Sequence, residues 1–270
     1  MANILALANQ KGGVGKTTTG VNLAASLAAI KRRVLVIDLD PQGNATMGSG
    51  VDKYKLAVTS GDVLLEKASI TDGVVTAERA GFSLLPANGD LTIAEVTLMN
   101  ASGREFKLRQ ALEPHASDFD YVLIDCPPAL NTLTVNALVA AHGVIIPMQC
   151  EYYALEGLSA LMATVERIRQ AANPNLHITG LLRTMFDPRN NLSNDVSNQL
   201  ISHFGDKVFE TVIPRNVRLA EAPSYGLPVL LYDKASRGAL AYLSLAGELL
   251  RKERRARAYS SVSPMRTRAT

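Results

Sequence analysis

Short apolar runs rich in valine, isoleucine and leucine alternate along the chain with longer segments whose apolar residues recur at helical spacing. This alternation is typical of a parallel sheet covered by helices, because strands buried on both faces read as continuous apolar runs. The apolar runs predict strands at residues 4–8, 33–38, 82–86, 121–125, 143–149, 178–185, 208–213 and 229–232. The helical spacing predicts helices at residues 16–30, 131–141, 155–172, 192–204 and 236–257.

The predicted fold class is α/β: a three-layer arrangement of a mostly parallel, twisted sheet of about seven or eight strands with helices on both faces. Residues 43–80 are the least regular stretch and contain one short helical piece, at residues 63–67. A chain of 270 residues, 47% of them hydrophobic, is long enough for one large core. We therefore expect a single domain over residues 1–250, followed by a basic helix end and tail over residues 251–270.

Composition excludes several classes of protein. Two cysteines, Cys126 and Cys150, are too few for a disulfide scaffold, and the apolar stretch at the N-terminus is too short for a signal peptide. No apolar run approaches the roughly 18 to 20 residues of a membrane-spanning helix. We expect a cytoplasmic protein without stable membrane insertion.

The net charge of +3 is unevenly distributed. Residues 251–270 hold seven lysines and arginines against one glutamate, whereas residues 1–250 hold 21 basic and 24 acidic residues. A basic tail of this kind is either a solvated segment or a surface that attracts a polyanion. Charge alone does not choose between nucleic acid and anionic lipid as that polyanion.

A glycine-rich turn joins the first predicted strand to the first predicted helix, with the sequence Lys11-Gly12-Gly13-Val14-Gly15-Lys16-Thr17-Thr18. Glycines in such a turn let successive backbone N–H groups point at phosphate oxygens, and the helix N-terminus adds its positive dipole end. Lys16 is placed to reach the β and γ phosphates of a nucleotide, and Thr17 to ligate Mg²⁺. We therefore predict a phosphate-binding loop (P-loop).

This loop departs from the general pattern G-x-x-x-x-G-K-[ST], because Gln10 stands at the first glycine position and Lys11 adds a second lysine. An extra ammonium group near that of Lys16 is costly to hold unless it has an anion of its own. We infer that Lys11 meets a phosphate oxygen, which need not belong to a nucleotide bound by the same subunit.

Two of the predicted strands end in acidic residues. Residues 33–38 lead into Asp38 and Asp40, and residues 121–125 end in Asp125, as in a Walker B strand. The carboxyl ends of parallel strands form the ligand-binding edge of an open sheet, so we expect these acids to converge on the P-loop. Three carboxylates at this edge predict metal and water chemistry.

Six segments together carry a family resemblance: residues 11–17, 38–44, 121–128, 186–189, 213–224 and 238–242. The segment Pro214-Arg215-Asn216 is more selective than the P-loop. On these motifs the chain resembles the ParA/Soj chromosome and plasmid partition ATPases, a branch of the deviant Walker A ATPases with the P-loop NTPase fold. The resemblance extends from residue 4 to about residue 250.

The resemblance implies ATP and Mg²⁺ as ligands and a sandwich homodimer that forms with ATP, in which Lys11 of each subunit reaches the nucleotide of the other. It implies that Asp40 orients the attacking water in a slow, partner-stimulated hydrolysis. The implied catalytic residues are Lys11, Lys16 and Asp40, and the implied metal site is Thr17, Asp38 and Asp125. The implied nucleotide-binding residues are Lys11, Gly12, Gly13, Val14, Gly15, Lys16, Thr17, Thr18, Met185, Pro214, Arg215 and Asn216, of which Met185 and the last three border the adenine.

The resemblance also implies that the ATP-bound dimer binds double-stranded DNA without sequence preference, on the nucleoid, through Arg189 and Arg218. Arg215, Lys234 and Arg237 are weaker candidates for this contact. The implied partner is a ParB-type centromere-binding protein. The larger family members carry an N-terminal helix-turn-helix domain, but here the P-loop begins at residue 11, so we expect no operator binding.

Three alternative functions are open to a chain with these motifs. A MinD-like ATPase shares the P-loop and the acids but needs an amphipathic C-terminal helix, whereas residues 251–259 are basic without an apolar face. A metallocluster carrier would use Cys126 and Cys150, which lack Cys-x-x-Cys spacing and are better interpreted as core residues. An ATPase that positions other cargo by the same cycle is not distinguished by sequence.

Overall fold

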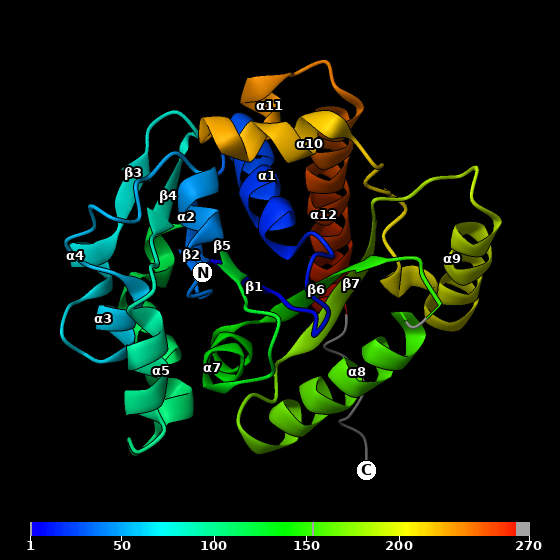
Figure 1. Cartoon of the computed structure of the whole chain (residues 1–270). Helices are drawn as coiled ribbons and strands as arrows, with labels where there is room; N and C mark the ends of the chain where they lie inside the picture. Colours follow the sequence, from blue (N-terminus) through cyan, green and yellow to red (C-terminus); the bar gives the residue numbers. More distant parts are fainter. Residues whose placement is uncertain (1, 153, 263–270) are drawn as a thin grey trace, which may run out of the picture.

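The computed structural model describes residues 2–152 and 154–262 of the chain (Figure 1). The strands are β1 Asn3–Leu7, β2 Val34–Asp38, β3 Val75–Ala77, β4 Phe82–Leu85, β5 Tyr121–Asp125, β6 Gly143–Gln149 and β7 His177–Thr184. They form one sheet in the order β3-β4-β2-β5-β1-β6-β7. β3 is antiparallel to β4, and the other neighbouring pairs are parallel.

Helices cover both faces of this sheet and complete three layers (Figure 1). The α-helices are α1 Lys16–Ala29, α2 Asn44–Gly48, α3 Ser60–Leu64, α4 Ile70–Gly73, α5 Leu91–Leu98, α6 Lys107–Leu112, α7 Thr132–Ala140, α8 Ala154–Ala171, α9 Asn191–Phe204, α10 Val217–Glu221, α11 Val229–Tyr232 and α12 Arg237–Val262. The 3-10 helices are η1 Arg104–Phe106, η2 Glu113–Asp118, η3 Gly205–Lys207 and η4 Ala222–Tyr225.

The two faces of the sheet carry separate cores. Successive residues of a strand point to opposite faces. In β2, Val34 and Val36 join the core formed with α1 and α12, whereas Leu35 and Ile37 join the core formed with α5, α7 and α8. The sheet is therefore buried on both sides, which is why its strands read as continuous apolar runs.

The structure confirms the predicted fold class and corrects two of the predicted strands. Six predicted strands are present with ends within one residue, and all five predicted helices are present. Residues 229–232 instead form α11, because Pro228 precedes them and its carbonyl accepts hydrogen bonds from the amides of Leu231 and Tyr232 at 3.0 and 3.1 Å. An apolar run of four residues has no period that could distinguish a strand from a helix.

Residues 208–213 are not a strand either, although they run beside β7. Their link to β7 includes an isolated bridge between Leu181 and Val208. The amide of Phe209 donates to the carbonyl of Leu181 at 3.0 Å, and that of Ile213 donates to the carbonyl of Arg183 at 2.9 Å. The segment is thus extended but lacks a regular ladder.

The irregular stretch at residues 43–80 contains more structure than its pattern predicts: α2, α3, α4 and β3 lie there. Capping boxes begin two of these helices, pairing Thr59 with Asp62 and Ser69 with Asp72. The short helical piece expected at residues 63–67 is α3, which begins earlier because Thr59 caps it. The spacing of these caps is a signal that hydrophobic periodicity does not capture.

The last helix extends five residues beyond its predicted end, to Val262, so the basic segment from residue 251 to that point is helical rather than frayed. Glu253 fastens this helix to the sheet, since it accepts hydrogen bonds from Asn3 Nδ2 and the Tyr121 hydroxyl, both at 2.6 Å. Residues 263–270 of the predicted tail lie outside the described residues. In the part of the chain that the structure describes, no helix has the length and apolar character to cross a membrane.

Gly180 in β7 leaves room for the ring of Phe209, because a Cβ atom at this position would lie 2.3 Å from Phe209 Cε2. We expect Gly180→Ala to lower the free energy of unfolding by about 1–3 kcal/mol, since the added methyl forces the ring to move. Gly157→Ala in α8 is the control: nothing lies within 4 Å of the added methyl, so stability should be unchanged or higher by up to about 1 kcal/mol. Urea unfolding compares the variants, and equal stability would contradict this packing.

Candidate functional site

The glycine-rich turn lies between the carboxyl end of β1 and the start of α1. Gly13 and Gly15 have φ values of 73° and 90°, in the left-handed region that favours glycine. Gly15 is the N-cap of α1 and supplies no side-chain hydrogen bond to the first helical amides. Those amides are therefore open to an anionic ligand at the helix N-terminus.

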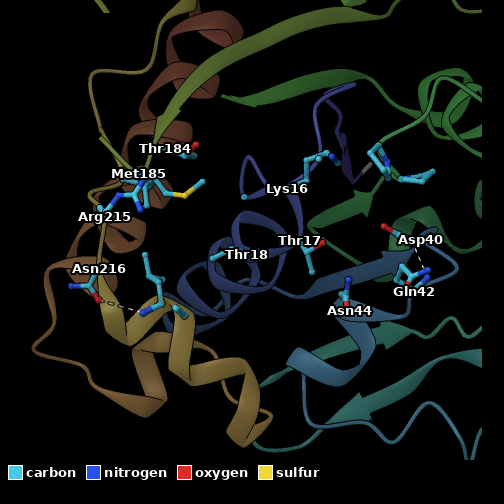
Figure 2. A pocket seen from close by; sticks show the side chains of 18 of the residues that line it. Lys16, Thr17, Thr18, Asp40, Gln42, Asn44, Thr184, Met185, Arg215 and Asn216 are labelled. Carbon is cyan, nitrogen blue, oxygen red and sulfur yellow. Dashed lines mark hydrogen bonds between the residues drawn. The ribbon is translucent and has the colours of Figure 1, made fainter. Parts of the chain in front are cut away.

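This turn forms the middle of a cleft of about 770 Å³ (Figure 2). Figure 2 shows Asp40 and Asn44 on one side of Lys16, and Met185 and Arg215 on the other. The predicted site residues that line the cleft are Gly12, Gly13, Gly15, Lys16, Thr17, Thr18, Asp40, Met185, Pro214, Arg215 and Asn216. The cleft thus runs from Asp40, just beyond β2, to Met185 and residues 214–216, beyond β7.

Lys16 is the buried cation of the cleft, with 7% of its surface exposed. Its ammonium donates a hydrogen bond to the carbonyl of Lys11 at 3.1 Å. Burial lowers the pKa of Lys16, and the charge of Asp125 opposes this shift. An anion in the cleft would favour the charged form of Lys16 in the same way.

Asp38 and Asp125 are fully buried and lie side by side, because they are register partners in β2 and β5. The hydroxyl and amide of Thr46 donate to Asp38 Oδ2 at 2.7 and 2.9 Å, and the hydroxyl of Thr17 donates to Asp125 Oδ2 at 2.6 Å. Burial raises the pKa of Asp38 to about 6. Burial, and then the charge of Asp38, raises the pKa of Asp125 well above its usual value.

The two buried acids fit a divalent cation that also contacts a phosphate ligand. Asp125 Oδ1 is buried without a hydrogen-bond partner. Among residues 2–152 and 154–262, no group of three or more His, Cys, Asp or Glu side chains is placed to hold a metal by itself. The unpartnered Asp125 oxygen suits Mg²⁺, which keeps several waters and binds through one or two carboxylates together with substrate phosphates. The residues that could hold it are Thr17, Asp38 and Asp125.

Asp40 is partly exposed and faces the cleft (Figure 2). Its amide donates to Asp38 Oδ1 at 3.1 Å, and its Oδ1 accepts a hydrogen bond from the amide of Gln42 at 2.9 Å. These bonds fix the turn that carries the carboxylate. The remaining lone pairs of Asp40 can accept a hydrogen bond from a water in the cleft.

Lys11 does not line the cleft. Its ammonium pairs with Glu151 Oε2 at 2.5 Å, and about half of each side chain is exposed. The anion that Lys11 requires is therefore supplied within the chain, by a carboxylate that follows β6. Ion pairs this exposed contribute only about 0–1 kcal/mol, so Lys11 can exchange this partner for a more highly charged anion.

Two predicted residues of the nucleotide set are fixed by contacts with neighbouring elements. Val14 is buried, and its carbonyl accepts a hydrogen bond from the Thr184 hydroxyl at 2.8 Å. Met185 has φ 48°, a left-handed conformation that is strained for a residue with a side chain. Its sulfur accepts a hydrogen bond from Gln149 Nε2 at 3.1 Å. The strained backbone directs the Met185 side chain into the end of the cleft beyond β7 (Figure 2).

Arg189 and Arg218 lie outside the cleft and are exposed. Arg189 donates two hydrogen bonds to the carboxylate of Asp187, at 2.9 and 2.8 Å. Arg218 pairs with Glu221 at 2.8 Å and with Asp233 at 3.3 Å. Each arginine therefore reaches the surface with its charge partly neutralised by an acid of its own neighbourhood.

Cys126 and Cys150 are both buried and free. Burial raises the pKa of both thiols, that of Cys150 to about 11. They stay protonated at neutral pH, whereas the thiolate is the form that ligates a metal. This agrees with the interpretation of both cysteines as core residues.

Sequence reasoning did not identify Thr46, Thr184, Asn44 or Glu151. Thr46 bonds to Asp38, Thr184 and Asn44 line the cleft, and Glu151 holds Lys11. Thr184 ends β7 and Glu151 follows β6 by two residues, while Asn44 and Thr46 belong to the short helix α2 that follows β2. The rule that these strand ends form the ligand-binding edge is the signal that could have found them.

Comparison with known proteins gives matches along nearly the whole chain. Residues 2–178 match a family model described as "AAA domain". The chromosome partitioning protein ParA of Caulobacter vibrioides is 52% identical over 253 residues, which are 93% of this chain and 95% of that protein. The sporulation initiation inhibitor protein Soj of Bacillus subtilis is 50% identical over 249 residues, 92% of this chain and 98% of that protein.

A solved structure is also similar over most of its length. Cobyrinic acid a,c-diamide synthase from Mycobacterium smegmatis, with bound ATP analog and magnesium, superposes with a TM-score of 0.83 at 40% sequence identity. The superposition covers 94% of this chain and 96% of that chain. The arrangement of strands and helices described above is therefore one that solved proteins share.

The raised pKa of Asp38 predicts a pH dependence of stability in the absence of ligand. Its value in the folded protein, about 6, lies above the ordinary 3.8, so the folded chain holds a proton that the unfolded chain releases. The free energy of unfolding should therefore fall as the pH rises from about 4 through about 6. Urea unfolding at a series of pH values measures this fall, and Asp38→Asn should make it shallower; the fall that remains comes from Asp125, whose pKa is also raised by burial.

Asp120→Asn is the control for this experiment, because about a third of the Asp120 side chain is exposed and hydrogen bonds from Arg33 lower its pKa. This variant should keep the fall in stability. An Asp38→Asn protein whose stability follows the same pH slope as the wild type would contradict the assignment.

Proposed function

Because the chain belongs to the ParA/Soj family of partition ATPases, we propose that it binds ATP with Mg²⁺, dimerises in that state and hydrolyses ATP slowly. The dimer binds double-stranded DNA without sequence preference and segregates a chromosome or plasmid, in the cytoplasm and on the nucleoid. Its partner is a ParB-type centromere-binding protein that stimulates hydrolysis. The observation that carries the proposal is the cleft lined by Lys16, Thr17 and Asp40, with Asp125 held behind it by the Thr17 hydroxyl and Asp38 beside Asp125.

ATP fits the two ends of this cleft. The triphosphate lies along the P-loop amides and Lys16, and the adenine lies against Met185 and the loop Pro214-Arg215-Asn216. The bound ATP analog and magnesium of the 40% identical structure support ATP and Mg²⁺ as the ligands. The two buried acids then lie near the phosphates, where a cation offsets their mutual repulsion.

Hydrolysis transfers the γ-phosphoryl group of ATP to water: the bond from the γ-phosphorus to the β–γ bridging oxygen breaks as the bond to the water oxygen forms, which leaves ADP, inorganic phosphate and a proton. Bound Mg²⁺ supplies charge neutralisation at the β and γ phosphates. Asp40 orients the attacking water, and Lys16 stabilises charge that develops on the phosphate oxygens. Positioning and charge neutralisation supply most of the catalysis, as in other phosphoryl transfers.

Lys11 links dimerisation to catalysis. In the proposed dimer its ammonium leaves Glu151 and meets the triphosphate bound by the other subunit, where it acts as an arginine finger does. A triphosphate carries several negative charges and Glu151 carries one, and an interface excludes the water that weakens the exposed ion pair. ADP lacks the γ-phosphate, so it attracts Lys11 less.

Variants of the phosphate lysine and of the water-orienting acid should separate binding from hydrolysis. We expect Lys16→Ala to abolish binding of a fluorescent ATP analogue. Asp40→Ala should keep ATP affinity within a few-fold, lose phosphate release by at least about 100-fold, and accumulate as a dimer, because the water is no longer oriented. Light scattering with ATP and with ADP measures the mass, and an Asp40→Ala protein that stays monomeric with ATP would refute this role.

The DNA-binding surface is tested by Arg189→Glu combined with Arg218→Glu. This double variant should still dimerise with ATP but bind DNA at least about tenfold more weakly. The slope of log affinity against log salt concentration, which is negative, should become smaller in magnitude by about 2 to 4. The control is Arg169→Glu, an exposed arginine that pairs with Glu166 at 2.9 Å on α8. Fluorescence anisotropy with two duplexes of unrelated sequence measures both. Wild-type affinity in the double variant would place the surface elsewhere, first at residues 251–255.

A further inference from the structure

Two buried charged side chains hold the backbone segment that leads into the loop Pro214-Arg215-Asn216. Arg183 comes from β7 and Glu248 from α12, and their exposed fractions are 8% and 3%. Neither residue lines the cleft. Both direct their hydrogen bonds at residues 209–211, a few residues before the loop.

Arg183 binds the carbonyl side of this segment. Its Nη2 donates to the carbonyls of Phe209 and Glu210 at 2.8 and 3.1 Å. Its Nη1 donates to the hydroxyl of Ser197 in α9 at 2.8 Å. The guanidinium therefore ties β7, α9 and the segment together.

Glu248 binds the amide side of the same segment. Its Oε1 accepts a hydrogen bond from the amide of Glu210 at 2.8 Å, and its Oε2 accepts one from the amide of Thr211 at 2.9 Å. The peptide groups around residue 210 thus lie between a positive and a negative side chain, with their dipoles aligned to both. Each of these four bonds is charge-assisted, and such bonds are roughly twice as strong as neutral ones.

The clamp formed by Arg183 and Glu248 explains why residues 208–213 do not continue the sheet. Backbone groups that a strand would offer to a neighbouring strand are bound by side chains. Burying two charged side chains costs more free energy than a ladder of neutral backbone hydrogen bonds that would satisfy the same groups. The two charges therefore hold the backbone on a path that such a ladder would not produce. That path continues to the loop, where the amide of Phe186 donates to the carbonyl of Ile213 at 3.0 Å.

We infer that Arg183 and Glu248 are positioning residues for base recognition: they set the loop at residues 214–216 against the purine base of the bound nucleotide. The inference rests on the proposed function, which places the adenine at this end of the cleft. The P-loop follows β1 and the acids end β2 and β5, whereas the side chains of the clamp bind residues 209–211 and Ser197. β7 contacts the P-loop through the hydroxyl of Thr184, which donates to the carbonyl of Val14, and not through the side chain of Arg183. Loss of the clamp therefore weakens the contact with the base and spares the contacts with the phosphates.

The test compares full-length Glu248→Gln with the matched control Glu253→Gln. Glu253 lies in the same helix and also accepts two hydrogen bonds, but from Asn3 and Tyr121 instead of the clamped segment. The probes are ATP and inorganic tripolyphosphate, which has no base, each measured with Mg²⁺ by displacement of a fluorescent nucleotide. Glu248→Gln should bind ATP about tenfold more weakly and tripolyphosphate within about twofold of wild type, because one amide loses its charged acceptor. Glu253→Gln should change neither affinity.

Equal losses for ATP and tripolyphosphate, or unchanged affinity for both in folded Glu248→Gln, would overturn the inference alone. Wild-type protein that binds neither probe would overturn the proposed function and this inference with it. If Glu248→Gln does not fold by circular dichroism, Arg183→Lys carries the same test. It keeps the charge but cannot present the guanidinium fork, so the same selective loss of ATP affinity is expected.

Discussion

Two carboxylates buried side by side at the ends of adjacent strands are the constraint on which the rest of the site depends. The parallel register of β2 with β5 makes Asp38 and Asp125 neighbours, and neither is exposed. Burial and mutual repulsion both disfavour their charged forms. Hydrogen bonds from Thr46 and Thr17 offset part of this, but one oxygen of Asp125 has no partner. The site is therefore completed by a ligand that brings positive charge.

The two lysines of the P-loop answer different parts of the same charge problem. Lys16 is buried beside the acids and stays in its own cleft. Lys11 is held at the surface by a single exposed carboxylate, Glu151, and this is an interaction that a triphosphate can replace. Under the proposed function, Lys16 binds the nucleotide of its own subunit and Lys11 contacts the triphosphate bound by the second subunit.

The sequence was sufficient to place Lys16, Thr17 and the three acids at one edge of the sheet, because each of them lies next to the end of a strand. The turn from residue 11 to residue 18 follows one strand and begins one helix, and each acid ends a strand whose apolar run is easy to recognise. Parallel strand order then brings the acids together without further information. The pairing of Lys11 with Glu151 could not be predicted, because it depends on where the segment after β6 ends relative to the turn.

The backbone path that leads to the loop at residues 214–216 could not be predicted from sequence for a related reason. Residues 208–213 have the side-chain pattern of a strand, and that pattern is the same whether a neighbouring strand or buried side chains satisfy the backbone. Arg183 and Glu248 are far apart in the chain and belong to no short motif. The strand prediction at residues 229–232 was wrong for a different reason, since the helix there is set by Pro228 and not by hydrophobic period.

Because burial raises the pKa of both Asp38 and Asp125, the two acids hold protons that are released when a cation and phosphates bind. Calorimetric titration of a non-hydrolysable Mg²⁺-ATP analogue, in buffers of different ionisation enthalpy, counts the protons released on binding. Because the pKa of Asp38 is about 6, the wild type should release about half a proton more than Asp38→Asn on binding at pH 6. Equal proton release by the two proteins at pH 6 would show that Asp38 does not hold a proton in the absence of ligand.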